Sequence, residues 1–158
     1  MIDDTDRQYL QRCVELAAEA LASGNEPFGS VLVSGDGNVL FEDHNRIGEG
    51  DHTRHPEFAI ARWAANNMTA KDRARATVYT SGEHCPMCAA AHGWVGLGRI
   101  VYASSAAQMT EWLSELGVPA FRVLPLPIDE VIRDTRVDGP VEEFAQQVRK
   151  LHIQSHSG

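Results

Sequence analysis

The stretch TVYTSGEHCPMCAAAHGWV, residues 77–95, connects a short predicted strand to a predicted helix through a turn that carries two cysteines. The β-branched and aromatic residues from Thr77 to Thr80 are typical of a strand. Pro86 is typical of a first helical turn, and the glycines at positions 96 and 98 favour the end of the helix near Val95. A strand that leads directly into a helix is the repeating unit of α/β proteins.

The chain on both sides of this stretch alternates between helices and strands. Apolar residues from Leu10 to Leu21 recur every three or four positions, which predicts an amphipathic helix that ends near Ser23-Gly24. We expect further helices over 56–67, 108–116 and 141–151, and further strands over 28–34, 38–43, 99–103 and 121–124. This alternation indicates an α/β fold with a mixed sheet that is covered on both faces, but it does not fix the strand order.

The composition is that of a soluble globular chain. Of its 158 residues, 43% are apolar and 23% are charged, and the length predicts a single domain over residues 1–158. No apolar run approaches the roughly 20 residues of a membrane span. The first six residues include three aspartates and no basic residue and resemble neither a secretory signal nor a transit peptide, so we expect a cytoplasmic protein without a membrane partner.

The net charge disfavours a nucleic-acid partner. The 14 Lys and Arg residues against 22 Asp and Glu residues give a formal charge of −8, whereas binding to phosphates needs a basic stripe. The densest basic stretch, Lys71, Arg73 and Arg75, is more typical of a solvated loop or helix end. A small neutral ligand fits this charge better.

Two of the three cysteines have the spacing of metal ligands. Cys13 falls on the apolar face of the first helix and is expected in the core, whereas Cys85 and Cys88 lie three positions apart in one helical turn. His55 stands at another predicted helix start, 30 positions before Cys85. One imidazole and two thiolates are ligands that zinc prefers, and three protein ligands leave the open position of a catalytic site. For the two cysteines, a structural zinc site or a redox pair is the alternative, and a redox pair would not explain His55 followed by an acid two positions later.

An acidic residue, Glu57, lies two positions after His55. It can lie beside a metal without ligating it, and a carboxylate there can move a proton between water and a leaving group. An acid in the first turn of a helix is also favourable for the helix itself, and both interpretations can hold.

The motif HPE at 55–57 followed by CPMC at 85–88 resembles the signature of the zinc-dependent cytidine deaminase-like superfamily. NEPFGSVLV at 25–33, His44-Asn45 and TSGEHCPMC at 80–88 resemble its guanine deaminase and tRNA-adenosine deaminase branch. The resemblance implies a three-layer α/β/α fold with a central mixed five-stranded sheet. It also implies a homodimer.

Site roles follow from the same resemblance. It implies that Glu57 shuttles the proton, that Asn45 hydrogen-bonds the edge of a base, that Phe28 packs on its face, and that Zn²⁺ is held by His55, Cys85 and Cys88. Taken alone, Asn45 is equally typical of a turn and Phe28 of a core.

The sequence departs from the branch at two positions in these motifs. His84 stands where Pro is usual, and we expect it to line the pocket rim and contact the substrate. Pro56 stands where Ala is commoner, and neither change removes a ligand or the acid. Near the C-terminus, Trp112, Glu142 or Glu143 could also reach the pocket, but this region does not align with the branch.

The implied reaction is hydrolytic deamination of a free nucleobase or related amino-heterocycle, a guanine-like purine, cytosine or triazine, with release of ammonia. A tRNA-editing adenosine deaminase is the first alternative, and it would need a basic surface. A non-catalytic zinc-binding scaffold is the second, and the presence of Glu57 disfavours it.

Overall fold

The computed structural model describes residues 1–157 and contains one five-stranded sheet. Its strands are β1 (Gly29–Val33), β2 (Val39–His44), β3 (Thr77–Gly82), β4 (Ile100–Ser104) and β5 (Val137–Asp138). The order across the sheet is β2-β1-β3-β4-β5, with β1 antiparallel to both neighbours and β3, β4 and β5 parallel to one another. The sheet is therefore mixed, as predicted.

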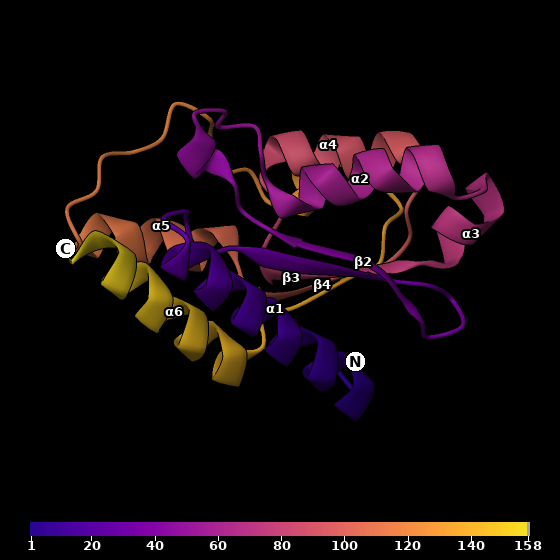
Figure 1. Ribbon diagram of the computed structural model, residues 1–158, viewed down its shortest axis with the longest axis horizontal. Coiled ribbons are helices and arrows are strands. Elements are labelled where there is room, and N and C mark those ends of the chain that lie inside the picture. The colour runs from indigo at the N-terminus through magenta and orange to yellow at the C-terminus, as the bar shows by residue number, and fades with distance from the viewer. Residues whose placement is uncertain (158) are drawn as a thin grey trace.

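Helices cover both faces of the sheet (Figure 1). On one side lie α1 (Asp4–Ala22), α5 (Ala106–Glu115) and α6 (Glu142–His156), and on the other lie α2 (Pro56–Asn67) and α4 (Pro86–Val95). A short helix, α3 (Ala70–Arg75), precedes β3, and two 3₁₀ turns, Ile47–Glu49 and Ile128–Glu130, interrupt the loops. The predicted three-layer α/β/α architecture is confirmed.

The core consists of apolar clusters on the two sides of the sheet. All five residues of β1 are buried, and successive side chains alternate between the clusters, Val31 and Val33 facing α1 and Leu32 facing α2. Cys13 is fully buried in the first cluster, as expected. Gly29 allows α1 to approach β1 closely, because a Cβ there would lie 2.4 Å from the Cβ of Leu16. Val31, Leu32 and Val33 form the apolar run that is typical of a strand buried on both faces.

The two helices that carry the metal-ligand motifs have the predicted bounds, 56–67 and 86–95. Each begins with a proline in its first turn, whose missing N–H would have no partner inside the helix. α4 ends at Gly96, which has a positive φ of 76° that favours glycine. These signals are local, and they place both motifs at helix starts.

The strand predicted over 121–124 is wrong. The fifth strand is β5, in which Val137 pairs with Ile100, and residues 119–127 are an exposed loop instead. Prolines at 119, 125 and 127 remove backbone donors from that loop, so it is poorly suited to a sheet ladder.

The basic stretch at 71–75 is a helix that was not predicted. It forms α3, which begins after Thr69, whose side chain accepts a hydrogen bond from the Asp72 amide. Six residues are too few to show a helical period. None of the helices among the described residues combines the length and apolar character of a membrane span.

Candidate active site

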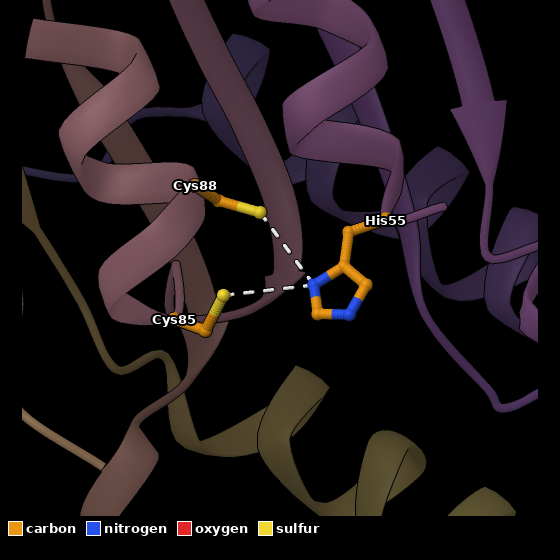
Figure 2. Close-up of side chains that lie close together, drawn as sticks. All are labelled: His55, Cys85 and Cys88. Carbon is orange, nitrogen blue, oxygen red and sulfur yellow. Dashed lines mark hydrogen bonds between the residues drawn. The ribbon is translucent and has the colours of Figure 1, made fainter. Parts of the chain in front are cut away.

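The starts of α2 and α4 bring the three predicted metal ligands together (Figure 2). His55 and Cys85 are the residues that precede the two helices, and Cys88 follows in the first turn of α4. His55 Nδ1 lies 3.5 Å from the Sγ atoms of both Cys85 and Cys88. All three candidate ligand atoms lie within 4.8 Å of one another, so one ion can contact them simultaneously.

The donor set fits zinc. One imidazole nitrogen and two sulfurs are the atoms that zinc prefers, and hydrogen bonds with Cys88 and His55 lower the pKa of the Cys85 thiol to about 4. Neither sulfur is joined in a disulfide. Within the described residues, no fourth His, Cys, Asp or Glu belongs to this group. Three protein ligands are the arrangement of a catalytic rather than a structural zinc site.

Glu57 lies beside the ligands but outside their group. Its side chain is buried, and burial raises the pKa of its carboxyl group to about 7. The Ser30 hydroxyl lies 3.0 Å from Glu57 Oε1 and 2.9 Å from Thr80 Oγ1. Thr80 in turn donates to the Gly82 carbonyl at 3.0 Å. Strands β1 and β3 therefore provide a hydroxyl that orients the carboxyl group.

A cavity of about 470 Å³ opens in front of these residues. It is lined by His55, Glu57 and Cys85, and also by Asn45 and Phe28, the two residues predicted to contact a base. Asn45 Oδ1 accepts a hydrogen bond from the Ile47 amide at 3.1 Å, which orients the carboxamide. Phe28 packs its ring against His152 of α6, with centroids 5.2 Å apart, and closely over Gly82.

His84 does not line this cavity. Its side chain is 1% exposed and packs against His92, with ring centroids 5.4 Å apart. The residue before Cys85 points into the protein rather than toward the rim, so the predicted contact between His84 and a substrate is not supported.

The C-terminal candidates also lie away from the cavity. Trp112 belongs to the core between α1 and α6, and Glu143 pairs with Arg7 on the surface. Glu142 accepts a hydrogen bond from Gln146.

Sequence analysis missed much of the cavity wall. It also assigned no role to Ser30 and Thr80, which lie in the quoted motifs, are fully buried behind Glu57 and do not line the cavity. The remaining wall comes from four loops and the first turns of α4 and α5, and its residues include Glu26, His52, Glu83, Met87, Met109 and the loop 121–126. Of these, Glu26, Glu83 and Met87 lie within the quoted motifs, but no role was assigned to them.

Comparison with known families identifies the group to which this site belongs. Residues 3–104 match the model of the cytidine and deoxycytidylate deaminase zinc-binding region. The chain belongs to this family. It is therefore a zinc-dependent deaminase, with His55, Cys85 and Cys88 as its zinc triad.

Related deaminases differ in the substrates that their names give. A probable cytosine deaminase of Schizosaccharomyces pombe is 29% identical over 73% of this chain and 70% of its own length. A guanine deaminase of Bacillus subtilis is 34% identical over 65% of this chain and 67% of its own length. A tRNA-specific adenosine deaminase of Haemophilus influenzae is also 34% identical, over 63% of this chain and 58% of its own length. Family membership thus fixes the chemistry but not the substrate.

A solved structure with the same fold matches this chain over its whole length. A guanine deaminase from Nitrosomonas europaea superposes with a TM-score of 0.72 over 100% of this chain and 87% of its own, at 17% sequence identity. The structural match therefore includes the segment after residue 104, which the family model does not cover.

Proposed function

We propose that this deaminase acts on a free nucleobase or a related neutral amino-heterocycle, a guanine-like purine, cytosine or triazine. The supporting observation is the buried Glu57 carboxyl group, held by Ser30 next to the zinc triad in a cavity that also presents Asn45 and Phe28. In the overall reaction, the oxygen of water replaces the amino group on the ring and ammonia leaves.

Each residue has a distinct task in this proposal. Zinc, when bound by the triad, lowers the pKa of a coordinated water to about 7. Glu57 takes up a proton of the attacking water and delivers protons to the ring nitrogen and the departing amino group. Asn45 hydrogen-bonds the edge of the ring and Phe28 packs on its face. The buried position of Glu57 keeps bulk water away from the transferred proton.

The charges around the cavity support a neutral substrate. Three carboxyl residues, Glu26, Glu57 and Glu83, line it, whereas Arg122 is the one Lys or Arg among its described lining residues. Phosphate recognition relies on arginine or lysine clusters and on basic surfaces. A nucleotide or a tRNA would therefore bring its phosphates toward an acidic cavity on a chain of charge −8.

The test is an ammonia-release screen with the zinc-loaded protein. Guanine, cytosine, adenine and an aminotriazine are compared with deoxycytidine monophosphate and tRNA. We expect turnover of at least one free base, and a loss of about 100- to 10,000-fold in kcat for Glu57→Gln with zinc content retained. Ammonia from tRNA alone would overturn the proposed substrate class. Retained zinc without turnover of any compound would favour a non-catalytic scaffold.

The proposal also includes one domain over residues 1–158 and a homodimer, both expected from the sequence. Sedimentation velocity of the zinc-loaded protein tests the second point, and a single monomeric species would contradict it.

A further inference from the structure

One side of the cavity is apolar and exposed. We define the outer wall as Met87 of α4, Met109 of α5 and the loop 121–126, all of which line the same cavity as Glu57. Phe121, Val123 and Leu124 are 54%, 58% and 67% exposed. Large apolar side chains that border a cavity and face solvent gain free energy when an apolar group covers them.

Glu83 anchors the outer wall at two points, the start of α5 and the end of the loop. Glu83 Oε1 accepts a hydrogen bond from the Ala106 amide, and Glu83 Oε2 accepts one from the Ile128 amide, both at 2.9 Å. These amides lie at the start of α5 and just after the loop. Because both carboxylate oxygens are engaged with the backbone, Glu83 fixes the wall and does not need a substrate to satisfy it.

Polar recognition groups lie elsewhere in the cavity. They come from other segments than the outer wall: Asn45 directly follows β2, Glu57 belongs to the first turn of α2, and His52 and Thr53 lie on the loop that leads to α2. Along the outer wall, Arg122 is the one polar side chain. The cavity of about 470 Å³ lies within the range of roughly 300 to 1,000 Å³ that is typical for ligands larger than a free base.

We propose that the substrate is a neutral amino-heterocycle that carries an apolar aryl or alkyl substituent. The ring occupies the end of the cavity at Glu57, Asn45 and Phe28, and the substituent lies on the outer wall. A sugar substituent suits this position less, because its hydroxyl groups would face hydrocarbon without hydrogen-bond partners. This inference rests on the proposed deaminase function and, within it, favours a substituted amino-heterocycle over a free base.

Matched substrates test the inference. For guanine and for cytosine, the free base is compared with its ribonucleoside and with a derivative that carries a benzyl group on the same ring nitrogen as the sugar. The two substituents are similar in size and differ in polarity. We expect kcat/KM of the better benzyl derivative to exceed that of its ribonucleoside by about tenfold or more, which is the scale of selection by apolar contacts.

Variants of the outer wall show whether this preference arises there. Leu124→Asn places an amide on the wall at an exposed position, so the fold has little to lose. We expect the ratio of kcat/KM between the benzyl derivative and the ribonucleoside to fall at least fivefold. Val39→Asn is the matched control, because Val39 is 50% exposed and lies outside the cavity lining, and it should leave the ratio unchanged.

Several results would overturn the inference. One is a ribonucleoside that is turned over as well as the benzyl derivative, and another is an unchanged ratio in Leu124→Asn. If a second copy covers the wall instead, Leu124→Asn will shift the dimer equilibrium and lower both values of kcat/KM equally. In all these cases the deaminase function stands.

A lack of ammonia from every compound would contradict the proposed function instead. The inference is then judged by calorimetry with the zinc-loaded protein. The inference is supported if the benzyl derivatives bind more tightly than the ribonucleosides and if Leu124→Asn abolishes this difference. Equal binding of the two compounds would contradict it.

Discussion

The Ser30 hydroxyl carries one proton and has two oxygen neighbours, Glu57 and Thr80. Because Thr80 gives its own proton to the Gly82 carbonyl, its oxygen can only accept from Ser30, and the Ser30 hydroxyl holds Glu57 either by donating to the carboxylate or by accepting from the protonated carboxyl group. Ser30 is fully buried, so water cannot replace it easily. A single small side chain on β1 thus positions the group that is proposed to transfer protons.

Replacement of Ser30 by alanine tests this positioning role. A hydrogen bond to a charged group contributes about 1.5 to 3 kcal/mol, so we expect kcat to fall about 10- to 100-fold with a much smaller change in KM. Steady-state kinetics on the best substrate measures both constants. Ser114→Ala, at an exposed position of α5, serves as the control. An equal rise in KM would indicate a role in substrate binding instead.

The zinc triad can be tested through its buried sulfur. Cys88→Ser keeps the size of the side chain but replaces a sulfur ligand by a hydroxyl, so we expect most of the bound zinc to be lost in elemental analysis. Because zinc binds only the folded chain, zinc at about 100 times its Kd should add about 2.7 kcal/mol to the free energy of unfolding of the wild type and much less to the variant. Cys13→Ala should retain zinc, since Cys13 lies in the core.

At the scale of elements, a buried carboxylate ties the start of α1 to the sheet. The Asp6 carboxylate accepts hydrogen bonds from both terminal guanidinium nitrogens of Arg99, at 2.9 and 3.1 Å, and from the Tyr79 hydroxyl at 2.6 Å. Burial alone would raise its pKa, but the hydrogen bonds from Arg99 and Tyr79 lower the pKa of Asp6 to about 2. Strand β3 and the residue that precedes β4 are thereby joined to the first helix.

The depressed pKa of Asp6 predicts an acid-sensitive contribution to stability. The contribution is fully present above the ordinary pKa of 3.8 and is lost as the pH falls toward 2, since the unfolded chain then binds the proton first. We expect Asp6→Asn to lower the free energy of unfolding by about 2 kcal/mol at pH 7. In urea titrations the difference from the wild type should shrink between pH 4 and pH 2. Asp4→Asn, at an exposed position of the same turn, should show no such convergence.

On the scale of the whole molecule, the acidic charge bears on how a substrate arrives. A chain of charge −8 repels anions over the Debye length, whereas a neutral ring feels no such field. We therefore expect kcat/KM on a neutral base to change less than about twofold between 0.05 and 0.5 M salt. Added salt would raise kcat/KM for an anionic substrate by screening the repulsion and lower it for a cationic one, so a strong change in either direction at constant pH would contradict the proposed class.

The sequence by itself determined the features that depend on neighbours along the chain. Proline in the first turn defined the starts of α2 and α4, glycine defined the end of α4, and the family motif then fixed the zinc triad and its chemistry. The deaminase family and the three-layer fold followed from these short segments. Such signals are local, because helix starts, helix ends and ligand spacing within one turn involve residues only a few positions apart.

Only the tertiary structure decided the rest. The fifth strand is Val137–Asp138 rather than 121–124, because pairing at a sheet edge depends on which segment reaches β4. Ser30 meets Thr80 across 50 positions, and Glu83 reaches Ile128 across 45. His84 turned inward to His92 although it adjoins a zinc ligand. These contacts arise from the packing of distant segments, for which no pattern among neighbouring residues exists.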